Sequence, residues 1–269
     1  MATLPTNLRL SKQDIKNASY CAEALWYGIN YKNSNPIFSD ELLLKYFAEP
    51  MYKNGKYAAR FHPDIFKSYV QILKNVCGLK ALNFSVNRMN YNQGIAAIKT
   101  RIHNHFLDVK KKHHRLIPVN LADVAIRDLS NGLVTQPRFR QIVLASRILY
   151  FNTPNIQTFN ISSGLAKNLG LGRVPDKYLT AFNLRMRKIY LANSTQLSSC
   201  KKPKILYLKG ELANSIDATN WWQRRVLDLA LLLFFGLVKM DPTIPQRVIA
   251  ARIERDNLLA LKMERIKAR

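Results

Sequence analysis

Apolar residues recur at helical spacing along most of this sequence, and a strand-like run occurs once, over residues 205–208. Near the N-terminus the apolar positions that share one helix face are Ile15, Ala18, Ala22, Leu25, Trp26 and Ile29. Their spacing of three or four residues is that of an amphipathic helix, whereas strands alternate with a period of two. The sequence therefore predicts a mainly α protein.

Helix-start and helix-stop residues set the expected helix boundaries. Ser11 and Asp14 form a capping-box pattern before the first helix, and Ser39 and Asn220 are caps for two later ones. A short helix is expected to begin at residues 162–163. Another short helix is expected over 40–48, and residues 81–109 are expected to form one or two helices. The other helices are expected over residues 63–77, 120–131, 137–150, 175–192, 221–238 and 246–269.

Loops between these helices divide the chain into four parts. A polar loop with Pro36 follows the first helix, a highly charged loop precedes Pro118, and a proline-rich segment precedes the last helix. Such segments are typical of boundaries between compact parts. We therefore expect a bilobal protein with an N-terminal arm at 1–36, an N-lobe at 37–117, a C-lobe at 118–240 and a C-terminal arm helix at 241–269.

Positive charge dominates the composition. The chain has 42 lysines and arginines against 17 aspartates and glutamates, a formal net charge of +25. Because so many like charges repel one another, this balance favours a protein that normally binds a polyanion. A general solubility charge is the alternative. Apolar residues make up 48% of the chain, so it can also build a substantial core.

Cysteine usage and hydropathy bear on the compartment. Cys21, Cys77 and Cys200 are isolated and odd in number, which fits free thiols in a reducing compartment. The N-terminus has no apolar signal-peptide core. The most apolar run, residues 229–238, is about half as long as a membrane span and is expected to be a buried helix. We therefore expect a soluble intracellular protein with no membrane insertion.

Residues 87–115 interleave cations with aromatic and imidazole rings, and Asp108 is the acid among them. Cations neutralise phosphates and rings stack on exposed bases, so this pattern favours single-stranded nucleic acid. The candidate RNA-binding residues here are Arg88, Tyr91, Lys99, Arg101, Lys110, Lys111, Lys112 and Arg115.

A second basic cluster lies between residues 173 and 209, opposed by Asp176. Its candidate RNA-binding residues are Arg185, Arg187, Lys188, Lys201, Lys202 and Lys204. In a bilobal protein the two clusters are expected to line a shared groove; two unrelated solvated faces are the alternative. No signature of base-specific readout is found in the sequence, so the expected mode is non-specific backbone binding with stacking.

The terminal helices are candidates for contacts between copies of the chain. In the last helix, we assign one apolar face to Val248, Ile249, Ile253, Leu259, Met263 and Ile266. This face is expected to dock on a neighbouring copy, and packing on its own body is the alternative. In the first helix the corresponding candidates are Ile15, Leu25 and Trp26, for which an ordinary core position is equally compatible.

Signatures of enzymatic sites are not found in the sequence. There is no phosphate-binding glycine loop, no zincin motif and no nucleophile elbow. His103 and His105 lie two apart in an expected helix, so they point to different faces and make a poor metal site. Carboxylates are too scattered for a two-metal nuclease. We therefore expect no enzyme activity, no cofactor and no metal.

Several short stretches resemble the nucleoproteins of segmented negative-strand, bunyavirus-type RNA viruses, with the tospovirus and emaravirus groups nearest. They are LSKQDI at 10–15, LIPVNLADVAIR at 116–127 followed by Asn131-Gly132, LGL at 169–171, PDKY at 175–178, and FFGLVK at 234–239. The resemblance is spread over most of the chain.

This resemblance implies a largely helical, bilobal protomer that holds genomic RNA in a basic groove between the lobes. It also implies arms that link neighbouring protomers into a ring or filament, a viral polymerase as a partner, and a location in the virion and the host cytoplasm. By order, the family's RNA-contacting helices correspond to the regions of Lys99 and Arg101 and of Arg185, Arg187 and Lys188. A basic RNA-binding module that stays monomeric, such as a ribosome-associated or viral movement protein, is the alternative.

Overall fold

The computed structural model describes residues 8–32, 38–47, 122–132, 142–152, 158–172, 175–208 and 220–267. All regular elements in these ranges are helices, so the expected mainly α class is confirmed for the described part. The chain folds into two compact units. One, which we call the terminal unit, comprises Pro5–Lys45 and Lys188–Arg269; the central unit comprises Met1–Leu4 and Tyr46–Arg187.

These units divide the chain differently from the expected lobes and arms. Boundaries are found near residues 45 and 187, whereas the sequence pattern placed them near 36, 117 and 240. Residues 5–36 of the expected N-terminal arm and the whole expected C-terminal arm belong to the same unit as the end of the expected C-lobe. Composition shifts mark where loops lie, but they do not show which distant helices pack together.

The central unit contains α6 (Ala122–Gly132), α7 (Ile142–Asn152), α8 (Ser163–Asn168) and the first part of α9 (Pro175–Ala192). The Asn183 side chain of α9 donates to the Asp123 carboxylate at the start of α6. Ser162 caps α8 as expected, and its hydroxyl accepts from the Leu165 backbone N–H. The expected helix from Pro175 to Ala192 is confirmed in full.

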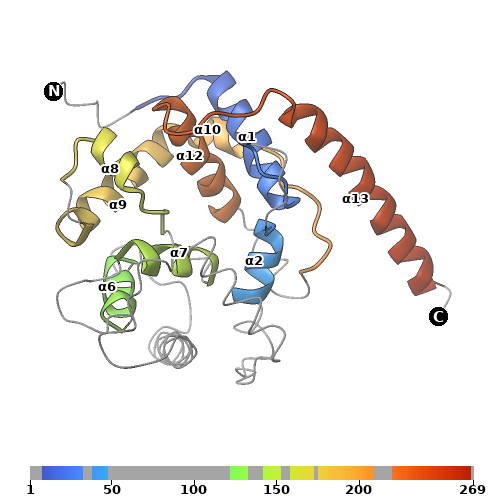
Figure 1. Ribbon diagram of the computed structural model, residues 1–269, viewed down its shortest axis with the longest axis horizontal. Helices are drawn as coiled ribbons and strands as arrows, with labels where there is room; N and C mark the ends of the chain where they lie inside the picture. Colours follow the sequence, from blue (N-terminus) through green and yellow to red (C-terminus); the bar gives the residue numbers. More distant parts are fainter. Residues whose placement is uncertain are drawn as a thin grey trace. The chain divides into compact units, whose positions relative to one another are not determined.

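The core of the terminal unit lies between α1 (Lys12–Trp26) and α12 (Asn220–Phe234). Trp26 is fully buried and its ring lies 6.1 Å from that of Trp221 and 6.2 Å from that of Trp222. Figure 1 shows α1 beside α12 and the short helix α10 (Ser194–Ser198). The expected capping box of α1 is confirmed, because the Ser11 and Asp14 side chains each bind the other's backbone N–H.

A buried asparagine fixes the chain that leads into α1. The Asn193 carboxamide, between α9 and α10, accepts from the Leu10 N–H and donates to the Leu8 carbonyl, both at 2.8 Å. Asn193 is 2% exposed, so these hydrogen bonds form away from water. The start of α1 is therefore held by residues far along the sequence.

The expected strand at residues 205–208 is wrong. This segment is irregular, and the carboxylate of Glu41 in α2 (Asp40–Phe47) accepts hydrogen bonds from the backbone N–H groups of Leu206 and Tyr207, each at 2.6 Å. A side chain thus satisfies two backbone donors that a neighbouring strand would otherwise satisfy. Ser39 caps α2 as expected by accepting from the Leu42 N–H.

The last two helices differ slightly from their expected bounds. The helix α12 ends at Phe234, four residues before the expected end at 238, and Gly236 follows with a φ of 64°. That left-handed conformation is favourable for glycine and ends the helix. The final helix, α13, spans Ile244–Lys267 and starts beside α1 (Figure 1).

Candidate nucleic-acid interface

The first basic cluster lies outside the described residues. This applies to Arg88, Tyr91, Lys99, Arg101, Lys110, Lys111, Lys112 and Arg115. The second cluster is described, but its members belong to different units. Arg185 and Arg187 are in the central unit, and the four lysines are in the terminal unit.

The α9 cations serve different purposes. Arg185 is half-buried and its guanidinium donates to the Leu169 carbonyl, so it holds the end of α8 in place. Arg187 and Lys188 are exposed, and neither has an ionic partner among the described residues. Of these three, Arg187 and Lys188 are the cations available to a ligand.

The lysines after α10 also differ from one another. Lys201 is exposed, while burial lowers the pKa of the Lys202 amine. The Lys204 ammonium lies 2.8 Å from the Asp256 carboxylate in an exposed ion pair. The three lysines therefore differ: Lys201 has no ionic partner among the described residues, Lys202 is half-buried and Lys204 is ion-paired.

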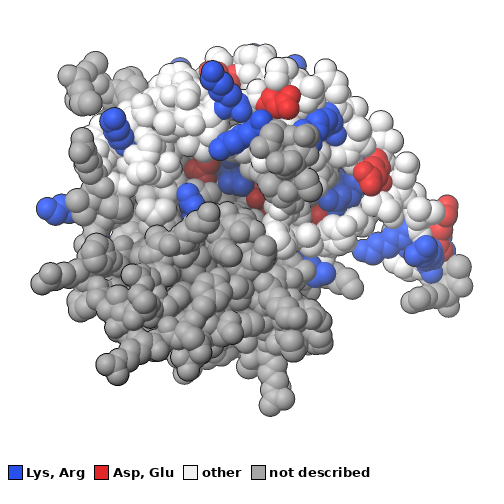
Figure 2. Space-filling model, viewed as in Figure 1, with Lys and Arg blue, Asp and Glu red and all other residues white. Residues whose placement is uncertain are grey.

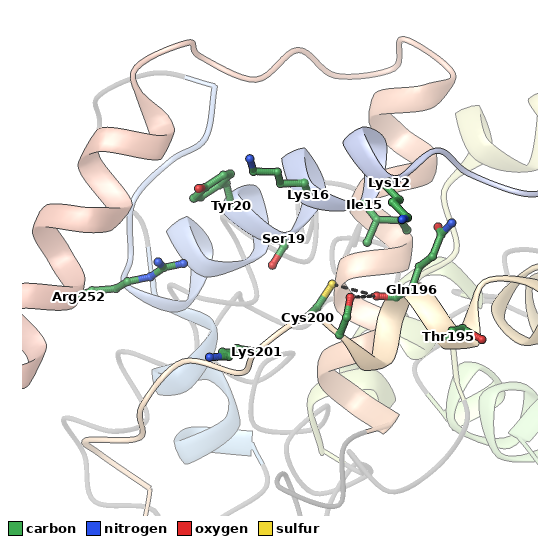
Figure 3. A pocket seen from close by; sticks show the side chains of 11 residues that line it. Lys12, Ile15, Lys16, Ser19, Tyr20, Thr195, Gln196, Cys200, Lys201 and Arg252 are labelled. Carbon is green, nitrogen blue, oxygen red and sulfur yellow. Dashed lines mark hydrogen bonds between the residues drawn. The ribbon is translucent and has the colours of Figure 1, made fainter.

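A pocket of about 550 Å³ in the terminal unit brings Lys201 together with cations from elsewhere in the chain. Figure 3 shows its lining side chains coming from α1, from the α10 region and from α13. The basic ones are Lys12, Lys16, Lys201 and Arg252. None of the described residues that line this pocket carries a carboxylate, so the formal charge of its lining side chains is positive.

Three of these cations were missed by sequence reasoning, namely Lys12, Lys16 and Arg252. A signal was present for the first two, because they lie four apart in α1 on the side away from the apolar face that packs on α12. For Arg252 no local pattern exists, because α13 carries bases and acids together. Figure 2 shows both kinds of charged side chain along that helix.

The thiol of Cys200 lies in the pocket wall. Its Sγ contacts the Gln196 carbonyl at 3.6 Å (Figure 3). Burial raises the pKa of the Cys200 thiol, and a hydrogen bond with Ser19 works in the opposite direction. Cys21 is fully buried, and desolvation raises its thiol pKa to about 12. Both groups are therefore neutral thiols at pH 7.

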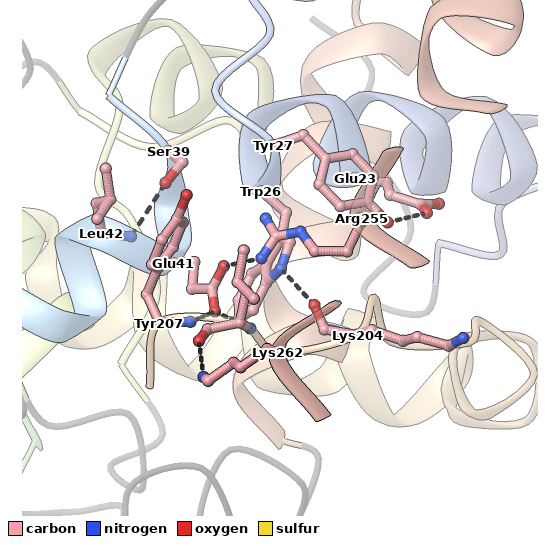
Figure 4. A network of polar contacts seen from close by, with 11 residues as sticks. Glu23, Trp26, Tyr27, Ser39, Glu41, Leu42, Lys204, Tyr207, Arg255 and Lys262 are labelled. Atoms are coloured by element: carbon pink, nitrogen blue, oxygen red, sulfur yellow. Dashed lines mark hydrogen bonds and ion pairs between the residues drawn. The ribbon is translucent and has the colours of Figure 1, made fainter. Parts of the chain in front are cut away.

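Ion pairs fix the α13 wall of the pocket. The Arg252 guanidinium binds the buried Glu23 carboxylate of α1 and lies over the Tyr20 ring. One turn on, the buried Arg255 donates to Glu41 at 2.6 Å (Figure 4). Its guanidinium lies 5.2 Å from the Tyr27 ring centroid and 5.4 Å from that of Tyr207. These contacts attach α13 to α1, α2 and the 205–208 segment.

The candidate oligomerisation residues fall into two groups. Ile15, Leu25 and Trp26 are buried within the terminal unit, and Val248 is buried where α13 packs on it. Leu259 is half-buried. The remaining candidates are exposed on α13: Ile249, Ile253, Met263 and Ile266. The expected single apolar face therefore divides into a part that faces the terminal unit and a part that faces solvent.

Metal-binding clusters and membrane-spanning helices are absent from the described part of the chain. Among the described residues, no group of three or more histidines, cysteines or acids is close enough to hold a metal ion. In the same part of the chain, no helix has the length and apolar character needed to cross a bilayer.

Comparisons with known proteins were made at three levels. No family model, no curated protein and no solved structure matches this chain.

Proposed function

We propose that this protein is a nucleoprotein that coats single-stranded RNA without base specificity and polymerises along it. The observation that carries the proposal is the pocket of α1, the α10 region and α13, which is lined by three exposed lysines and the paired Arg252 and by no acid among the described residues. On a chain with a net charge of +25, such a site is suited to the phosphates of a polyanion.

The chemistry of the free cations supports binding without base specificity. Lys12, Lys16 and Lys201 are exposed ammonium groups with no ionic partner among the described residues. Ammonium groups act as point charges toward phosphates, which are the same in every sequence. Base identity is therefore expected to have little influence on affinity.

The solvent-facing part of α13 supports polymerisation. Ile253 and Met263 are 59% and 57% exposed. Leu258, Leu261 and Ile266 are also exposed, farther along the helix. If α13 binds a neighbouring copy, these side chains are the apolar groups it offers to that contact. The resemblance to viral nucleoproteins extends the proposal to a viral polymerase as a partner and to a location in virions and host cytoplasm.

A second candidate is a monomeric RNA-binding module, and one observation favours it. The apolar face of α1 is buried in the core of its own unit, as shown by Ile15, Leu25 and Trp26. These residues are therefore not available for contact with a neighbouring copy. In that case RNA binding would not require contacts between protomers.

Binding of labelled single-stranded RNA tests the proposal. We expect oligonucleotides of unrelated sequence to bind with similar affinity, and the affinity to fall steeply as salt rises. Light scattering should show a complex containing several protomers. Absence of binding at moderate salt would contradict both candidates, whereas one protomer per long RNA would favour the monomeric module.

A further inference from the structure

Two helix faces form most of the pocket wall. From α1 the lining residues are Lys12, Ile15, Lys16, Ser19 and Tyr20, and from the α10 region they are Thr195, Gln196, Ser199, Cys200 and Lys201. The α1 positions are spaced at three and four residues, which places them on one face. Because both helices contact each other and α12, the wall belongs to the packed part of the unit.

Three of the four cations that line this pocket, Lys12, Lys16 and Lys201, have no ionic partner among the described residues. Lys12 and Lys16 are four residues apart in α1, an arrangement in which like charges destabilise an isolated helix. The fourth cation, Arg252, is paired with the Glu23 carboxylate, and the Asp14 carboxylate of α1 accepts hydrogen bonds from Ser11. The neutral Cys200 thiol adds no negative charge. An anion is therefore the ligand that removes the repulsion.

The size and lining of the pocket indicate more than a bare anion. Its volume of about 550 Å³ is within the ordinary range for small-molecule sites. Besides the cations, it offers the hydroxyls of Ser19, Thr195 and Ser199, the side chain of Ile15 and the ring of Tyr20. A phosphate group would fill only a fraction of that volume, whereas a phosphate with its ribose and base would fill much of it.

We propose that the pocket between α1, α10 and α13 binds one nucleotide unit of RNA. Its phosphate lies at Lys12, Lys16 and Lys201, and its nucleoside occupies the remaining volume beside Tyr20. This inference rests on the RNA-binding function proposed above and assigns a defined subsite to it.

Cys200 provides a reporter of occupancy inside the pocket. We would measure the rate at which iodoacetamide alkylates Cys200 in the full-length protein, using mass spectrometry to separate its peptide from those of Cys21 and Cys77. The added ligands would be inorganic phosphate, adenosine 5′-monophosphate and a single-stranded RNA of about 20 nucleotides. RNA binding would be followed in the same samples by fluorescence anisotropy.

We expect saturating nucleotide and saturating RNA each to slow the alkylation of Cys200 by about fivefold or more. The variant Lys12→Gln/Lys16→Gln should lose this protection, and its salt slope for RNA binding should fall by between one and two units. The matched control is Lys167→Gln/Lys239→Gln, which removes two exposed charges outside the pocket and should keep the protection. Unchanged thermal unfolding would show that both variants are folded.

The outcomes separate this subsite from the general function. RNA binding with an unchanged Cys200 rate would overturn the subsite and leave the proposed function intact. Protection by phosphate but not by the mononucleotide would overturn the nucleotide assignment, leaving a simple anion site. Protection by the mononucleotide without any RNA binding would overturn both the proposed function and the assignment to RNA.

Discussion

Arg255 is a charged residue in a position that usually holds an apolar one. It is 7% exposed, its partner Glu41 is fully buried, and two tyrosine rings flank its guanidinium. Glu41 also accepts two backbone hydrogen bonds, so its charge is almost completely compensated within the protein. A buried pair of this kind is costly to break, because the remaining charge then has neither water nor a partner.

Replacing Arg255 tests that reasoning. The variant Arg255→Met should lower the free energy of unfolding by about 3 to 5 kcal/mol, measured by urea denaturation. The control Asp256→Asn removes the exposed ion pair with Lys204 one residue away and should cost less than about 1 kcal/mol. Equal losses in both variants would contradict a special role for the buried pair.

The buried carboxyl of Asp40 is expected to make the stability of the protein depend on pH. Burial raises the pKa of its carboxyl above the ordinary value, against the opposing effect of the Arg225 guanidinium at 2.7 Å. The folded protein therefore keeps this proton to higher pH than the unfolded chain does. Over that interval the folded state binds more protons, so the contribution of Asp40 to stability falls as the pH rises.

The variant Asp40→Asn cannot make this titration. As the pH is raised from about 4 to about 7, we expect wild-type protein to lose stability relative to the variant. Urea denaturation at a series of pH values measures the difference. If the stability difference between the two proteins stays constant with pH, or changes in the opposite direction, the ion pair with Arg225 outweighs burial in setting the pKa of Asp40.

At the scale of elements, α13 combines an attached face with an exposed one. Deleting the whole helix would remove the arginines that pair with Glu23 and Glu41, so loss of oligomers after such a deletion could come from a destabilised fold. Substitutions on the exposed face avoid that difficulty, because they leave the ion pairs in place.

The variant Ile253→Ser/Met263→Ser is therefore the better test of polymerisation. We expect it to remain folded and to give smaller assemblies with RNA in light scattering. The matched control is Leu184→Ser/Leu191→Ser on α9, where the side chains are 55% and 59% exposed. If the α13 variant forms assemblies of wild-type size, or if the α9 variant forms equally small ones, α13 is not the specific contact between protomers.

Local signals predicted the helices well and their packing poorly. The Ser11–Asp14 box, the Ser162 cap and the bounds of α9 follow from residues close in sequence, so the sequence alone indicates them. The strand-like run at 205–208 failed because its backbone donors bind Glu41. For the pocket, Lys201 was identified, but its neighbours come from α1 and α13. Such long-range pairings have no periodic signature.

At the scale of the whole molecule, net charge should control thermal stability. A charge of +25 produces self-repulsion that salt screens, so adding sodium chloride should raise the unfolding temperature of the RNA-free protein. With single-stranded RNA bound, added salt should instead lower the unfolding temperature, because salt releases the RNA that stabilises the folded protein. Differential scanning fluorimetry measures both series. The same salt dependence with and without RNA would count against phosphate neutralisation as the source of binding.

The pairing of Glu41 with Arg255 also has a consequence for biosynthesis, since 214 positions separate the two residues. At ordinary translation rates of roughly 5 to 20 residues per second, Arg255 is synthesised about 10 to 40 s after Glu41. Until α12 (Asn220–Phe234) is made, Trp26 of α1 has no α12 to cover it, and the nascent chain exposes apolar surface. Ribosome-associated chaperones are therefore expected to engage this N-terminal segment until synthesis is nearly finished.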